Sequence, residues 1–198
     1  MLFRSAPGRE FAHGVEHRQI GRLSLQRPEV FMVQLRALAR AAVHGNLKIM
    51  IPMVTTPEEL AQCRVLLAQA VRELHDRGLD VPQPPIGMMV EVPAAAFSLE
   101  AFEADFYSIG SNDLLQYLSA VSRDEARLAA LSAPGPAFWR VMREMTQHGR
   151  AVMREVSLCG DLASDVRHLP ALLRSGLRTL SVAPAALAAV KSAVRGTE

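Results

Sequence analysis

Four side chains that could do chemistry lie at the ends of three short apolar runs in this sequence, and each run is typical of a buried β-strand. Glu91 follows the run GMMV, Asn112 and Asp113 follow DFYSIGS, and Cys159 ends the run VSLC. In a parallel α/β sheet or barrel, the C-terminal ends of the strands meet at one rim, where ligands bind. We therefore expect two carboxylates, an amide and a thiol to share one site.

A pair of carboxylates at such a rim is typical of a magnesium site. Mg²⁺ is usually bound by one or two protein carboxylates, with waters and substrate oxygens as its other ligands. An ionised carboxylate after a run as apolar as GMMV also needs a cation or several hydrogen-bond donors beside it. The alternative is structural: Glu91 is then the first loop residue, and Asp113 caps a helix together with Asn112. The residues alone leave both interpretations open.

Cys159 allows two interpretations of the same kind. A cysteine at a strand end is often a small buried side chain, but beside suitable charges it could act as a catalytic acid or nucleophile. Arg4 and Arg123 could bind phosphate or carboxylate through the planar guanidinium, or lie solvated at the surface. Cys63 and Cys159 match no metal-binding or redox spacing, so we expect free thiols. The six histidines form no metal-ligand pattern.

Composition restricts the class of protein. The 198 residues are 49% hydrophobic and 21% charged, with 22 basic against 20 acidic side chains and a formal net charge of +2. These values exclude a disordered, collagen-like or disulfide-rich chain, and the charge balance argues against nucleic acid or an anionic membrane as the partner. The longest apolar stretch, 180–190, contains Pro184 and is too short to cross a bilayer. No apolar signal segment follows the first residues, so we expect a cytoplasmic protein that acts on a small molecule.

The elements that must position these residues follow from alternating patterns. Short β-rich apolar runs alternate with longer segments of helical period, which predicts an α/β fold with a parallel sheet. The predicted strands are Leu47–Met53, Ile86–Val92, Asp105–Ile109, Val156–Cys159 and Leu177–Ala183. The predicted helices are 28–44, 57–77, 137–148, 164–175 and 184–194, the fourth bent or broken near Pro170. Residues 1–26 show no clear period, so we expect a partial first strand and an irregular segment before one domain over 27–198.

One helix start has a clear signature. The sequence Thr56-Pro57-Glu58-Glu59 places a hydroxyl at the N-cap, a proline at the first helical position and a glutamate at the third. This is the capping-box pattern, in which side chains bond two backbone N–H groups at the start of a helix. We expect this helix to end near Arg77, before Gly78.

The order of these motifs resembles the C-terminal, phosphoenolpyruvate-binding domain of Enzyme I, the phosphoenolpyruvate-protein phosphotransferase of the bacterial sugar phosphotransferase system. The resemblance covers about residues 27 to 195. The matching segments are RPEVFMVQLRALARAAVHGNLKIMIPMV at 27–54, GMMVEVPAAA at 87–96, DFYSIGSNDLLQY at 105–117, AVSR at 120–123, LCGDLASD at 158–165 and LSVAP at 180–184. A short match, LFRS at 2–5, resembles the end of the family's first barrel strand.

The resemblance implies a (β/α)₈ barrel of the TIM type, with Mg²⁺ and phosphoenolpyruvate (PEP) at its C-terminal rim. Glu91 and Asp113 match the family's Mg²⁺ ligands, and Cys159 matches the acid that protonates C3 of the enolate after the phosphoryl group has left. The phosphate contacts are matched by Asn112, Arg4 and Arg123. The implied activity is Mg²⁺-dependent transfer of the phosphoryl group of PEP to a histidine on a separate domain, which feeds sugar uptake.

Two departures from the family define the alternatives. Family segments that carry further strands and a substrate-binding arginine and lysine have no counterpart between Arg4 and Arg27, which leaves about six of eight strands and an incomplete barrel. The family's phosphohistidine domain is also absent, so the resemblance implies an acceptor domain or phosphocarrier protein in trans. Exposed strand edges would favour a homodimer. The alternatives are an inactive remnant or PEP-binding module, and a Mg²⁺-dependent lyase that forms a pyruvate enolate.

Overall fold

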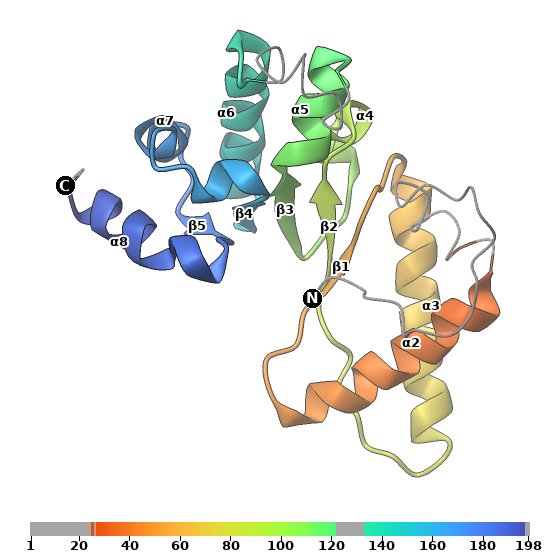
Figure 1. The fold of residues 1–198 in the computed structure, drawn as a ribbon. Coiled ribbons are helices and arrows are strands. Elements are labelled where there is room, and N and C mark those ends of the chain that lie inside the picture. Colours follow the sequence, from red (N-terminus) through yellow and green to blue (C-terminus); the bar gives the residue numbers. More distant parts are fainter. Residues whose placement is uncertain (1–24, 26, 122–132, 197–198) are drawn as a thin grey trace.

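A computed structural model describes residue 25 and residues 27–121 and 133–196 of the chain. The first-strand fragment expected around Arg4, and Arg4 and Arg123 themselves, lie outside these residues. Within them, five parallel strands pair in the order in which they occur in the sequence (Figure 1). They are β1 (Ile49–Ile51), β2 (Ile86–Val90), β3 (Phe106–Gly110), β4 (Glu155–Cys159) and β5 (Thr179–Leu180). The predicted parallel α/β sheet is confirmed.

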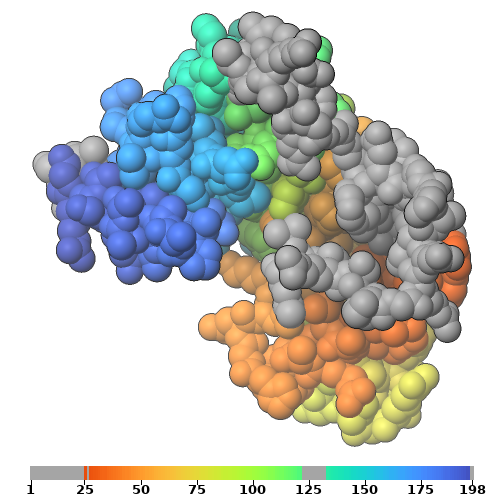
Figure 2. All heavy atoms as spheres, in the orientation of Figure 1, coloured from red at the N-terminus to blue at the C-terminus, as the bar shows by residue number. Residues whose placement is uncertain are grey.

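Helices connect the strands. The α-helices are α2 (Pro28–Ala41), α3 (Pro57–His75), α4 (Pro93–Ala96), α5 (Ser111–Ser119), α6 (Pro136–Ala151), α7 (Leu169–Arg174) and α8 (Leu187–Arg195). Short 3₁₀ turns are η2 (Ala42–His44), η3 (Leu99–Ala101), η5 (Asp161–Ser164) and η6 (Pro184–Ala186). In Figures 1 and 2, α2 and α3 (orange to yellow) and the C-terminal helices (blue) lie on opposite sides of the green central strands. In the part of the chain that the structure describes, no helix is both long enough and apolar enough to span a bilayer.

The helix predicted over 164–175 is wrong at its start. The 3₁₀ turn η5 ends at Ser164, and the α-helix begins only at Leu169. Pro170 is in the first turn of α7, where a backbone N–H has no intrahelical partner, so the proline fits the start of the helix and does not bend it. The sequence patterns predict no helix at α4, and they imply one at α5 only through the interpretation in which Asp113 and Asn112 cap a helix.

The outer strands are shorter than predicted. The run Leu47–Met53 forms only a three-residue strand, and Leu177–Ala183 forms only a two-residue strand. Within the described residues, β1 pairs only with β2, and β5 pairs only with β4. A strand with one neighbour makes one ladder of hydrogen bonds, so its ends are held less firmly than those of β2 and β3.

Burial is greatest in the centre of the sheet. All five residues of β3 are buried, and so are four of the five in β2. These near-continuous apolar strands are covered on both faces, as is typical of parallel sheets. In β4 only Leu158 is buried, which indicates that the cover thins toward β5.

One ion pair across the sheet agrees with a curved sheet. The Nζ atom of Lys48, just before β1, lies 2.7 Å from a carboxylate oxygen of Glu155, the first residue of β4. The strands β2 and β3 lie between β1 and β4, so the backbones of β1 and β4 would be about 14 Å apart in a flat sheet at the usual strand spacing. Lys48 also lies over the Phe106 ring of β3, at 5.2 Å from its centroid. The contact across one face is expected on the inside of a curving, barrel-type sheet.

The capping box of α3 is confirmed. The N–H of Thr56 donates to Oε2 of Glu59 at 3.1 Å, and the Thr56 side chain receives the N–H of the third helical residue. The helix ends at His75, and Gly78 follows with a φ of 77°, a left-handed conformation that glycine adopts without strain. The sequence thus located this helix to within a few residues.

Candidate active site

Glu91 directly follows β2 and is only 4% exposed. Its Oε1 accepts the backbone N–H of Met53 at 2.8 Å. Met53 follows β1 in a left-handed conformation with a φ of 55°, which is unusual for a side chain of this size and typical of functional loops. A Cβ added to Gly110 would lie 2.6 Å from Oε2 of Glu91, so the glycine at the end of β3 makes room for the carboxylate. The ends of three neighbouring strands therefore meet at Glu91.

Asp113 lies in the first turn of α5, which begins immediately after β3. The N-cap of this helix is Gly110, so the interpretation of Asp113 and Asn112 as caps is wrong. A carboxylate in the first turn is favoured by the partial positive charge at the start of a helix. The direct passage from β3 into α5 places Asp113 at the rim where Glu91 lies.

Asn112 connects this rim to the end of β4. Its Oδ1 accepts the backbone N–H of Asp161 at 3.0 Å, and its Nδ2 donates to the Asp161 carboxylate at 3.1 Å. Beside it, the hydroxyl of Ser111 donates to the carbonyl oxygen of Cys159 at 2.7 Å. These bonds fix the loop after β4 against the start of α5.

Cys159 is the last residue of β4 and is partly buried. Its Sγ donates to the carbonyl oxygen of Ile109 at 3.5 Å and accepts the hydroxyl of Ser108 at 3.7 Å. Burial raises the pKa of this thiol, and the negative charges of Glu91 and Asp113 raise it further. The thiol therefore keeps its proton at neutral pH, a requirement for an acid and a disadvantage for a nucleophile. Cys63 is the other free cysteine, so the prediction of free thiols is confirmed.

The two carboxylates are the residues that could hold a metal ion. In the described ranges, no group of three or more His, Cys, Asp or Glu side chains is arranged to bind one. A pair of carboxylates fits Mg²⁺, which accepts one or two protein oxygens and completes its shell with substrate and water. The room that Gly110 leaves is filled by the Glu91 side chain itself, so the glycine helps to set where this carboxylate lies.

The structure adds residues that the sequence did not single out. Met53 supplies its backbone N–H to Glu91, Ser108 bonds the thiol of Cys159, and Ser111 bonds its carbonyl group. The positions of the two serines, Ser108 inside the third predicted strand and Ser111 two residues after it, were a usable signal. No feature of the sequence signals the left-handed conformation of Met53.

This geometry agrees with a comparison with known protein families. Residues 15–198 match the family model described as PEP-utilising enzyme, PEP-binding domain. The chain belongs to this family. The matched range includes both the strands and the loops that carry Glu91, Asp113 and Cys159.

Curated relatives of the PEP-binding domain are longer proteins. The chain is 38% identical over 178 residues to the phosphoenolpyruvate-protein phosphotransferase of Priestia megaterium, and the match covers 88% of this chain and 31% of that protein. It is 43% identical over 179 residues to the multiphosphoryl transfer protein of Xanthomonas campestris pv. campestris, covering 88% of this chain and 21% of that protein. The chain thus spans less than a third of these relatives.

Solved structures confirm the fold. A citrate lyase from Burkholderia xenovorans superposes with a TM-score of 0.61 at 20% identity, covering 82% of this chain and 53% of that one. A malate synthase from Haloferax volcanii superposes with a TM-score of 0.61 at 13% identity, covering 90% of this chain and 49% of that one. The PEP-binding domain therefore has the predicted barrel-type α/β fold, of which the described residues form five strands and an incomplete barrel.

Proposed function

We propose that this PEP-binding domain is the catalytic domain of a phosphoenolpyruvate-protein phosphotransferase. The reaction is transfer of the phosphoryl group of PEP to a histidine on a separate domain, which leaves pyruvate. The observation that carries the proposal is the meeting of Glu91, Asp113 and Cys159 at the ends of consecutive strands, in a chain of the PEP-binding family. Burial of Glu91 and the raised pKa of Cys159 support distinct roles for these groups.

Glu91 and Asp113 are proposed to hold Mg²⁺. The bound ion would neutralise charge on the phosphoryl oxygens and on the enolate oxygen. The Met53 N–H bonded to Oε1 holds the Glu91 carboxylate in place, so its other oxygen can face the ion without reorganisation. Removal of either carboxylate is therefore expected to weaken PEP binding only in the presence of Mg²⁺.

The phosphoryl group is proposed to be bound by Asn112, Arg4 and Arg123. The amide nitrogen of Asn112 carries two hydrogens, of which Asp161 accepts one, and the second is assigned to a phosphoryl oxygen. The two arginines lie outside the described residues, and their assignment rests on the sequence motifs LFRS and AVSR. Their fixed positive charge would stabilise the phosphoryl group during transfer.

Cys159 is proposed to deliver the proton that completes pyruvate. The bond from the enol oxygen of PEP to phosphorus breaks as a histidine nitrogen binds phosphorus, and the electron pair stays on the enolate. C3 of the enolate then takes the proton from Sγ, which leaves a thiolate. The raised pKa of Cys159 favours recovery of that proton from water, so the thiol is restored for the next turnover.

The partners follow from this chemistry. The acceptor is proposed to be a phosphohistidine domain or phosphocarrier protein supplied in trans, and the working form a homodimer in the cytoplasm. The names of the relatives, phosphoenolpyruvate-protein phosphotransferase and multiphosphoryl transfer protein, support a protein acceptor. The edge strands β1 and β5 support association between copies.

The test is a transfer assay with the purified chain, PEP labelled in its phosphoryl group, Mg²⁺ and a phosphohistidine domain added in trans. We expect labelled histidine and release of pyruvate. Cys159→Ala is expected to slow pyruvate formation by about 10²–10⁴-fold, the usual contribution of a positioned acid, while PEP binding is retained. Bound PEP without any labelled histidine would contradict the transferase and leave a PEP-binding module. Release of pyruvate at the same rate from Cys159→Ala would contradict the acid role.

A further inference from the structure

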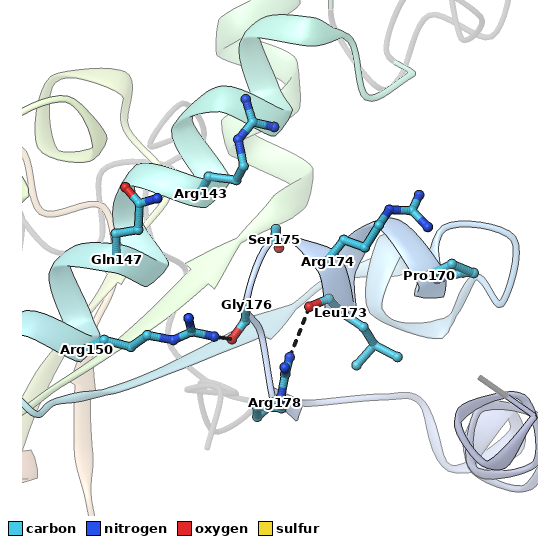
Figure 3. A pocket seen from close by; sticks show the side chains of 9 residues that line it. All are labelled: Arg143, Gln147, Arg150, Pro170, Leu173, Arg174, Ser175, Gly176 and Arg178. Carbon is cyan, nitrogen blue, oxygen red and sulfur yellow. Dashed lines mark hydrogen bonds between the residues drawn. The ribbon is translucent and has the colours of Figure 1, made fainter. Parts of the chain in front are cut away.

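A cavity lined by arginines lies between α6 and α7, away from the candidate active site. Its volume is about 570 Å³, within the range of small-molecule sites. Arg178 of this cavity precedes β5, whereas Cys159 ends the neighbouring parallel strand β4. The cavity therefore lies near the N-terminal ends of the strands, opposite to the rim that carries Cys159. Its lining is Arg143, Gln147, Arg150, Pro170, Leu173, Arg174, Ser175, Gly176 and Arg178 (Figure 3).

Two of the four arginines are held in place by backbone carbonyl groups. Arg150 donates to the carbonyl oxygen of Gly176 at 3.1 Å, and Arg178 donates to that of Leu173 at 3.0 Å (Figure 3). Arg178 also donates to the carbonyl oxygen of Leu177 at 2.6 Å. Gly176 has a φ of 101°, and a Cβ there would lie 2.8 Å from Nη2 of Arg150. The glycine therefore permits the close approach that orders this guanidinium.

The other two arginines are differently placed. Arg143 extends from α6 and Arg174 from the end of α7, on two sides of the cavity (Figure 3). Among the described residues, no hydrogen bond or ion pair holds either guanidinium. By contrast, Arg140 on the same helix pairs with Glu144 at 2.9 Å, and Arg36 pairs with Glu73 at 2.8 Å.

The cavity lining contains no acidic residue to balance the four positive charges. Like charges gathered in one cavity repel each other, and an anion would relieve this repulsion. Guanidinium groups match phosphate oxygens with two parallel hydrogen bonds, and the amide of Gln147 adds neutral donors. The basic charge is local, since the whole chain carries only +2. A compact ligand is therefore favoured over an extended nucleic acid, which needs a longer basic surface.

We propose that this arginine cavity binds a small, multiply charged phosphate compound, such as an organic diphosphate. All four arginines are exposed at this open cavity, so Arg150 and Arg178, held by backbone carbonyl groups, and Arg143 and Arg174, from the two helices, can contact the ligand together. This site is independent of PEP binding at the rim, so it goes beyond the proposed phosphotransferase function.

The test is calorimetric titration of pyrophosphate into the full chain in a low-salt buffer with EDTA, which removes divalent cations. The double variant Arg143→Gln/Arg174→Gln spares the two arginines bonded to backbone carbonyls. We expect this variant to bind pyrophosphate at least about tenfold more weakly, because it loses hydrogen bonds between charged groups, each of which contributes about a factor of ten or more in affinity. Arg40→Gln/Arg72→Gln, which removes the same charge from exposed positions on α2 and α3, is expected to change affinity by less than about twofold.

Three outcomes would overturn the proposal. They are no binding of pyrophosphate by the wild-type chain, an equal loss in both double variants, and tighter binding of a single-stranded oligonucleotide that depends on Arg143 and Arg174. Thermal melts of each variant serve as the control that it is folded. Glu91→Gln separates this site from the rim, because it is expected to leave pyrophosphate binding unchanged whether or not PEP binding fails.

Discussion

Ionisation of Cys159 is opposed by its burial and by the two carboxylates that converge on it. The Sγ proton is donated to the carbonyl oxygen of Ile109, and the charges of Glu91 and Asp113 raise the thiol pKa. The same carboxylates that are proposed to bind Mg²⁺ therefore help to keep the Cys159 thiol protonated. A metal at the rim would offset their charge and make the proton easier to release.

At the residue scale, the reactivity of Cys159 tests this coupling without any activity assay. We expect alkylation by iodoacetamide at pH 7.5 to be slower than for free cysteine, with a rate that still rises above pH 9, because the thiol pKa is raised. Glu91→Gln and Asp113→Asn are each expected to shift the rate profile to lower pH, whereas Glu100→Gln, at an exposed position of the η3 turn, leaves it unchanged. Mass spectrometry separates Cys159 from Cys63, whose pKa is raised to about 12 by burial. A plateau below pH 8 would contradict the arrangement.

The site residues were predictable where the sequence signals a strand end. Glu91 and Cys159 follow apolar runs, and the topology of a parallel sheet brings such positions together. The left-handed conformation of Met53 and the pairing of Asn112 with Asp161 were not predictable, because they depend on contacts between distant loops.

At the element scale, α3 shows how a local pattern defines a helix. The capping box at Thr56 and Glu59 satisfies backbone N–H groups that the helix itself leaves without partners. Thr56→Ala is expected to lower the free energy of unfolding by about 1 kcal/mol, the usual loss for an N-cap. Gln62→Ala, at an exposed position of the same helix, is the matched control and is expected to change it by less than about 0.5 kcal/mol. Urea denaturation measures both, and an equal effect of the two substitutions would contradict the cap.

Elements without such local signals were less predictable. Pro170 is compatible with a bend or with a helix start, and only the packing of α7, which contacts α8, decides between them. The extents of β1 and β5 depend in the same way on which strands lie beside them, which the sequence pattern of each strand does not contain.

At the scale of the whole molecule, the Lys48–Glu155 pair joins the start of β1 to the start of β4 across the sheet. Its hydrogen bond lowers the pKa of Glu155 below its ordinary value of 4.5. Because the pKa is lower in the folded state, the pair stabilises the fold above pH 4.5 and loses this contribution as the pH falls through the folded-state pKa. The gain at neutral pH is about 1 kcal/mol or less, since both side chains are about half exposed.

Lys48→Met is expected to raise the pKa of Glu155, as measured by NMR titration, and to remove the acid-dependent part of the stability difference. Lys191→Met on α8 removes the only other lysine and is expected to leave the Glu155 pKa unchanged. An unchanged Glu155 pKa in Lys48→Met would contradict contact across the curved sheet. The alternation of strands and helices predicted only a parallel α/β sheet, and the barrel was implied by the family resemblance, because curvature is a property of several strands together and has no signal in any single one.

The central claim is that the rim formed by Glu91 and Asp113 binds PEP through Mg²⁺. Calorimetric titration of PEP into the purified chain, with and without Mg²⁺, tests it most directly, with Glu91→Gln beside the wild type and Glu100→Gln as the matched control. The account predicts PEP binding that requires Mg²⁺, is lost in Glu91→Gln and is retained in Glu100→Gln. No binding by the folded wild-type chain, or equal Mg²⁺-dependent binding by wild type and Glu91→Gln, would contradict it.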